Sequence, residues 1–110
     1  MNLPGAQHAI IDRRKIVDYC LSPDHEDGQH KARIFASTLG LTINDADQLI
    51  EALRNAANTE DAALGKQDRY GQRYTIDFEF AGPSGRAKIR SAWIIGPDEN
   101  VPRLVTCYIL

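Results

Sequence analysis

The sequence has few cysteines and no long apolar run. Cys20 and Cys107 are the only two cysteines among its 110 residues, too few for a secreted scaffold held together by disulfides. They form no Cys-x-x-Cys pair of the kind that binds zinc, and we interpret both as reduced, semi-buried thiols. No apolar run approaches the ~18 residues that a membrane-spanning helix needs, so we expect no membrane partner.

A secretory signal peptide and an excess of one charge are also missing. Residues 1–11 show no basic leader followed by an apolar stretch, which predicts a cytoplasmic protein. The 13 Lys and Arg residues nearly balance the 15 Asp and Glu residues, so a polyanion would have to meet a local basic patch. With 43% hydrophobic and 25% charged residues, the chain is typical of one globular domain, and we expect residues 1–110 to form a single domain.

Several catalytic motifs are absent. There is no Gly-x-Ser-x-Gly, Walker loop or Gly-x-Gly-x-x-Gly, so no motif supports a serine hydrolase or a nucleotide-binding protein. There is also no His-Glu-x-x-His, and His25 and His30 lie five positions apart across a predicted loop-to-helix boundary. We therefore predict no metal site and no cofactor.

The first part of the chain carries helical patterns. Asp12 is a good N-cap for a helix that ends at Ser22-Pro23. A second helix is expected from Gln29 to Leu39, and a third, the clearest, after Asn44 as N-cap. One face of the third helix carries the apolar residues Ala46, Leu49, Ile50, Leu53 and Ala57.

The second part alternates with the period of strands. Residues 73–80 and 86–95 flank the turn Gly82 to Gly85, and both faces indicate one hairpin register. Phe78 should lie opposite Ile89 on the core side, and Asp77 opposite Arg90 on the other side. With a last strand from Arg103 to Ile109, we predict an α+β fold: two to three N-terminal helices packed on one face of a C-terminal antiparallel meander of three to four strands.

Two clusters of polar residues are candidates for chemistry. The first is the loop and helix start that hold His25, His30 and Lys31, because a histidine titrates near neutrality and a helix start favours phosphate oxygens. A solvated loop that only caps the second helix would explain the same residues. The second cluster lies on the strands, where Arg73, Lys88 and Arg90 share one face. Asp77 and Glu79 on that face would neutralise two of these cations, which is the alternative reading.

The chain also resembles a known family over nearly its whole length. The segments that carry the resemblance are Leu3-Pro4-Gly5, Asp18 to His25, Gly28 to Phe35, Leu39-Gly40-Leu41, Tyr70 to Tyr74, Gly82 to Gly85, Arg90 to Ile95 and Pro102 to Tyr108. The family consists of uncharacterised bacterial domains that occur alone or as the C-terminal tip of polymorphic toxins. Its element order is similar to that of the barnase, EndoU, colicin and RelE group of metal-independent ribonucleases.

The resemblance implies RNA cleavage through attack of a 2′-hydroxyl on the adjacent phosphate, without a cofactor. Such a reaction needs an acid and a base, and cations on the phosphate oxygens. The expected roles are His25 or His30 as acid/base, Lys31 and Arg90 as phosphate stabilisers, and Thr106 or Tyr108 as hydroxyl donor. Further RNA contacts are expected from Arg33, Arg73, Lys88 and Arg103.

Two functions stay open on the sequence alone. An active ribonuclease would need a small neutralising protein as partner, as in a pair of toxin and antidote. The acidic residues Asp24, Glu26 and Asp27 beside His25 argue against RNA binding there. The alternative is a non-enzymatic interaction or regulatory domain that binds a small partner protein.

Overall fold

A computed structural model describes all 110 residues. In it the chain forms helices first and then a sheet. The helices are α1 (Arg13–Lys15), which continues as a π-helical turn over Ile16–Cys20, α2 (Gln29–Ile34), which continues likewise over Phe35–Leu39, and α3 (Ala46–Thr59). The strands are β1 (Ala62–Asp68), β2 (Gly71–Gly82), β3 (Gly85–Ile95) and β4 (Arg103–Ile109). Short 3₁₀ turns cover Ala6–His8 and Ile43–Asp45.

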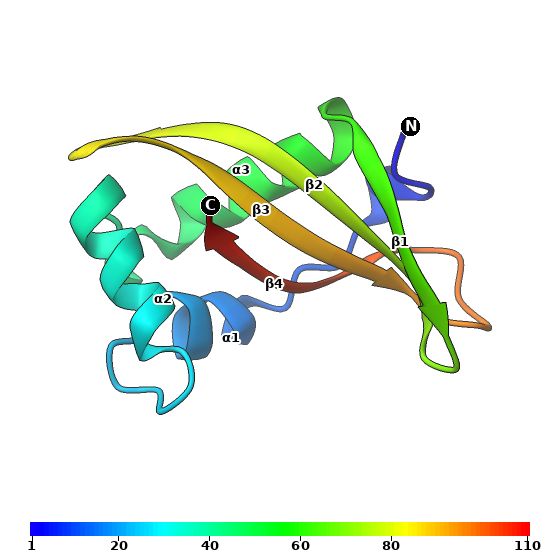
Figure 1. Ribbon diagram of the computed structural model, residues 1–110, viewed down its shortest axis with the longest axis horizontal. Coiled ribbons are helices and arrows are strands. Elements are labelled where there is room, and N and C mark those ends of the chain that lie inside the picture. The colour runs from blue at the N-terminus through cyan, green and yellow to red at the C-terminus, as the bar shows by residue number, and fades with distance from the viewer.

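The four strands form one antiparallel sheet in the order β1-β2-β3-β4. The helices pack on one face of this sheet, and α1 and α2 lie beside the edge strand β4 (Figure 1). This arrangement confirms the predicted α+β fold. No helix has the length and apolar character that a membrane crossing requires.

The predicted hairpin register is confirmed at every pair that was named. Phe78 lies opposite Ile89, and Asp77 lies opposite Arg90. Because side chains alternate along a strand, this register turns Ile76, Ile89 and Trp93 into the core. The indole nitrogen of Trp93 donates to Ser91 Oγ at 2.9 Å, and Ser91 Oγ donates to the Ile76 carbonyl at 2.9 Å. The polar atoms of this buried layer are therefore satisfied.

The helices show where local signals were correct and where they were not. Asp12 caps the first helix through a 3.0 Å hydrogen bond from the Arg14 amide, as predicted. Asn44 is not the N-cap of the third helix. The N-cap residue of α3 is Asp45, and Thr42 caps the preceding 3₁₀ turn through a capping box with Asp45.

The buried face of α3 was predicted with one error. Leu49 and Leu53 are fully buried, whereas Ile50 is only half-buried at the margin of the core. Strand β1 carries no alternating pattern because most of its residues are exposed, so its bounds were not apparent in the sequence.

Candidate phosphate-binding site

A pocket of about 310 Å³ lies where α1 and α2 meet the edge of β4. Its walls are Lys15, Tyr19, Lys31, Val105 and Thr106. Lys15 ends α1, Tyr19 lies in the π-helical turn, and Lys31 belongs to α2. Val105 and Thr106 come from a bulge in β4, where the register with β3 shifts between Ala92 and Trp93. A bulge redirects side chains at a sheet edge, and here it provides one wall of the pocket.

The ammonium group of Lys31 is held at the centre of this arrangement. Its Nζ donates a hydrogen bond of 3.1 Å to Thr106 Oγ1. It also lies 5.0 Å from the ring centroid of Tyr19 and 5.4 Å from that of Tyr108. Aromatic faces attract a cation at these distances without neutralising it. Lys31 is therefore half-buried and held in position.

No carboxylate neutralises the cations of this pocket. The ion pairs of the structure involve other residues, and neither Lys15 nor Lys31 takes part in one. Two free ammonium groups and the Thr106 hydroxyl thus face one hollow. Such a set matches an anion with several oxygens, such as a phosphate group.

His25 contacts Tyr19 but does not line the pocket. Its ring makes an edge contact with the Tyr19 ring at 4.7 Å. Its Nδ1 accepts hydrogen bonds from the backbone amides of Asp27 and Gly28, both at 3.0 Å. In this neutral tautomer the ring proton is on Nε2, so His25 can donate a proton from Nε2 while Nδ1 holds the loop that leads into α2.

Arg90 is anchored to a neighbouring strand. Its Nε and Nη2 donate to the Asp77 carboxylate at 2.8 and 2.9 Å. This bidentate contact raises the pKa of Arg90 above its ordinary value, with a smaller contribution from Tyr108 across the strand pair, and lowers the pKa of Asp77. Arg90 pairs across the strands with Tyr108, whose ring contacts Lys31.

The other predicted residues do not gather around the pocket. His30 is exposed on α2, and Lys88 is exposed opposite Glu79. Arg73 lies 3.8 Å from Asp68 on the far part of the sheet. Arg103 pairs with Glu99 at 2.9 Å.

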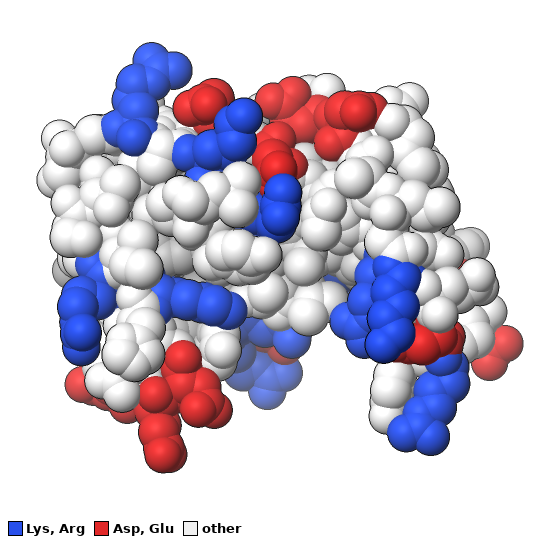
Figure 2. All heavy atoms as spheres, in the orientation of Figure 1, with Lys and Arg blue, Asp and Glu red and all other residues white.

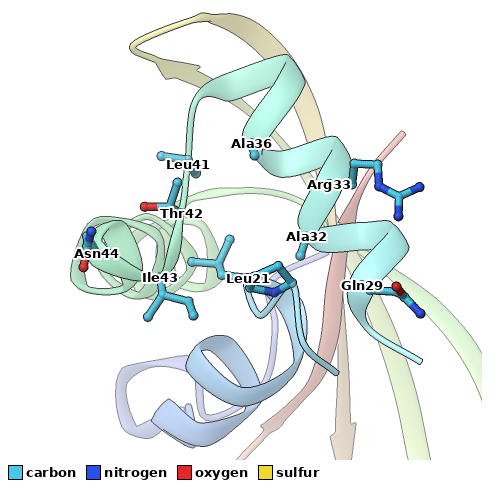
Figure 3. A pocket seen from close by; sticks show the side chains of 10 residues that line it. Leu21, Gln29, Ala32, Arg33, Ala36, Leu41, Thr42, Ile43 and Asn44 are labelled. Atoms are coloured by element: carbon cyan, nitrogen blue, oxygen red, sulfur yellow. The ribbon is translucent and has the colours of Figure 1, made fainter. Parts of the chain in front are cut away.

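Arg33 lies beside a different hollow. A groove of about 620 Å³, lined mainly by apolar groups, separates α2 from the segment Leu41–Asn44. Figure 3 shows the Arg33 guanidinium on the outer side of α2, pointing away from Thr42 and Ile43. The groove therefore offers an apolar surface with little charge of its own.

Charges of both signs lie on the face seen in Figure 2, and around α2 the two signs lie apart. Figure 2 shows basic atoms over α2, and a cluster of acidic atoms over the loop that leads into it. This loop holds Asp24, Glu26 and Asp27, all exposed. The acidic cluster and the Lys31 pocket are thus neighbours, yet the pocket itself is lined by no acid.

Three pocket residues were not predicted from the sequence: Lys15, Tyr19 and Val105. Lys15 belongs to the predicted first helix and Tyr19 to a segment that carries the family resemblance, but the sequence assigns neither a role. Neither lies near Lys31 or Thr106 in the sequence, so only the packing of the π-helical turn against β4 brings them together. No group of His, Cys, Asp and Glu side chains is placed to hold a metal ion.

Comparison with known proteins supplies the family. No curated protein matches the chain in sequence. Among solved structures, the chain is similar to one from Klebsiella pneumoniae 342, a complex between a contact-dependent growth inhibition toxin and its immunity protein. The TM-score is 0.74 at 22% identity, with 92% of this chain and 99% of that chain covered, so the two share a fold. The family described as Domain of unknown function (DUF6883) matches residues 2–110, and the chain therefore belongs to that family.

Proposed function

We propose that this protein is a toxin-type endoribonuclease that works without a metal ion and binds an RNA phosphate in the Lys31 pocket. The observation that carries the proposal is the position of Lys31, which donates to Thr106 Oγ1 at 3.1 Å beside a second free cation, Lys15. A preorganised charge of this kind acts where charge develops on the phosphate oxygens.

The roles of the residues follow from their positions. Lys31 and Lys15 bind the non-bridging oxygens, and the Thr106 hydroxyl donates to the same group. Arg90 approaches from the sheet beside Tyr108. His25 provides the proton of Nε2 for the leaving 5′-oxygen. The 2′-oxygen attacks the phosphorus and gives its proton to solvent water, while the bond from phosphorus to the 5′-oxygen breaks. That oxygen takes the Nε2 proton, which water restores to His25, and the products are a 2′,3′-cyclic phosphate and a free 5′-hydroxyl.

The fold relationship supports a role in a pair of toxin and immunity protein, and we propose the toxin role for this chain. The similar structure is described as a complex of a toxin with its immunity protein. We extend this description to a small neutralising protein as the partner of this chain. In cells, expression without that partner is expected to degrade RNA and stop growth.

A specific observation favours the alternative of a binding domain without catalysis. Nδ1 of His25 is occupied by two loop amides, so His25 has no free nitrogen with which to accept a proton. A domain that binds RNA or a partner protein needs no such nitrogen, and would use the same cations. The two functions are separated by whether RNA is cleaved.

The test is cleavage of an RNA panel in EDTA by purified wild-type protein and by single variants. Lys31→Ala is expected to reduce the rate by ~10²-fold or more. Lys66→Ala is the matched control, because Lys66 is an exposed lysine on β1 outside the pocket. Replacing the 2′-hydroxyl by hydrogen in the substrate must abolish cleavage. Monodisperse wild-type protein that leaves every RNA intact would refute the enzyme.

His25 needs a variant that separates catalysis from capping. His25→Asn places an amide oxygen near the position of Nδ1, so the loop amides keep an acceptor while the imidazole is lost. If His25 is the acid, His25→Asn retains the wild-type melting temperature and loses cleavage. If His25 only holds the loop, His25→Asn retains both, whereas His25→Ala loses stability by ~0.5 to 2 kcal/mol.

A further inference from the structure

The two cysteines, far apart in sequence, meet beneath the Lys31 pocket. The Sγ atoms of Cys20 and Cys107 lie 3.8 Å apart, and both residues are fully buried. Cys20 comes from the π-helical turn and Cys107 from β4, 87 positions later. A disulfide has an S–S distance of about 2.05 Å, so closing one requires the sulfur atoms to approach by less than 2 Å.

The two thiols have different surroundings. The Cys107 thiol donates to Cys20 Sγ, which lowers the pKa of Cys20 to about 6, with help from Thr106 and the charge of Lys31. The same contact raises the pKa of Cys107. The thiolate is the nucleophilic form of cysteine, so Cys20 is the thiol that attacks first and Cys107 the one that resolves the product.

The pair also adjoins the pocket. Cys20 Sγ lies 3.9 Å from the hydroxyl of Thr106, which lines the pocket. Each cysteine directly follows a residue of the pocket wall, Tyr19 before Cys20 and Thr106 before Cys107. A movement that draws the two sulfur atoms together therefore moves both walls that hold Lys31.

We infer that Cys20 and Cys107 form a peroxide-responsive pair that closes to a disulfide in the folded protein and weakens phosphate binding at Lys31. In the first step the Cys20 thiolate attacks one oxygen of hydrogen peroxide, giving a sulfenic acid and hydroxide, which takes up a proton to become water. In the second step Cys107 attacks the sulfenic sulfur, forms the S–S bond and releases a second water. The two thiols are oxidised, the peroxide is reduced, and a dithiol reductant reverses the change.

The experiment exposes the folded full-length protein to hydrogen peroxide and follows the intact mass and the peptides under non-reducing conditions. Wild-type protein is expected to lose the mass of two hydrogen atoms and to yield one Cys20–Cys107 cross-linked peptide, which dithiothreitol reverses. Cys107→Ser should stop at a sulfenic acid on Cys20 that dimedone traps. Cys20→Ser should react at least about tenfold more slowly than the wild type, because burial still raises the pKa of the remaining Cys107 thiol.

Three results would overturn the inference. One is that both thiols survive a treatment that fully oxidises free cysteine in the same tube. Another is that Cys107 reacts before Cys20, and the third is that the cross-link forms only in denaturant. Mass spectrometry detects the disulfide whether or not the protein acts on RNA. The effect of the disulfide on the pocket rests on the proposed RNA function, and equal RNA binding by the reduced and oxidised proteins would overturn that effect alone.

Discussion

The Lys31 ammonium group donates to the Thr106 hydroxyl across 75 positions of sequence. This contact joins α2 to the edge strand β4, and it fixes a cation at a place where no acid opposes it. The pocket around it depends on three elements that meet only in the folded chain.

Removing the hydroxyl partner should release Lys31. Thr106→Val keeps the shape and the β-branch of the side chain but cannot accept the hydrogen bond. We expect RNA binding to weaken by about tenfold, which corresponds to about 1.4 kcal/mol. Fluorescence anisotropy with a labelled RNA oligonucleotide measures the affinity of each variant for RNA. The control is Thr75→Val on β2, two strands away from β4, which should bind RNA as the wild type does.

The core prediction uses two leucines of opposite exposure. Leu53 is fully buried on α3, whereas Leu64 on β1 is 64% exposed. Leu53→Ala should lower the free energy of unfolding by about 2 to 5 kcal/mol, because it leaves a cavity. Leu64→Ala should change it by no more than about 0.5 kcal/mol. Denaturant melts of both variants give the comparison, and similar losses would show that the core has been assigned incorrectly.

The Asp77–Arg90 pair should contribute a small pH dependence to stability. Arg90 lowers the pKa of Asp77 in the folded state, so the folded protein favours the ionised carboxylate. This contribution is present above the ordinary carboxyl pKa of about 3.9 and is lost as the pH falls through the lowered value. Because both side chains are about one-third exposed, we expect no more than about 1 kcal/mol.

Asp77→Asn removes that titration. Melts of wild type and variant between pH 7 and acid should therefore converge at low pH, where the wild-type carboxyl is also neutral. A constant difference across this range would contradict the ion pair as the source.

The hairpin could be predicted because two independent patterns agreed. The apolar residues of β2 and β3 and the opposite charges on the other face indicated one register, and a shift by one residue would have broken both. The first helix was likewise predictable from Asp12, whose capping contact is local. The sequence therefore predicts features that depend on contacts between residues close in the chain, or on two strands with matching patterns.

The pocket could be predicted only in part, because its residues come together through long-range packing. Lys31 and Thr106 were proposed from the family resemblance, but Lys15 and Tyr19 were not, because no local pattern indicates which face of the first helix meets β4. The bulge at Val105 gives no signal in the alternation of β4. The meeting of Cys20 with Cys107 also depends on this long-range packing.

The most direct measurement of the central claim is the salt dependence of RNA binding. Each phosphate contact to a single strand contributes about 0.7 to the slope of log K against log salt concentration. We expect Lys31→Ala, folded by circular dichroism, to reduce the slope by about 0.7, and Lys66→Ala to leave it unchanged. An unchanged slope in Lys31→Ala, or an equal reduction in both variants, would contradict the assignment of the Lys31 pocket as the phosphate-binding site.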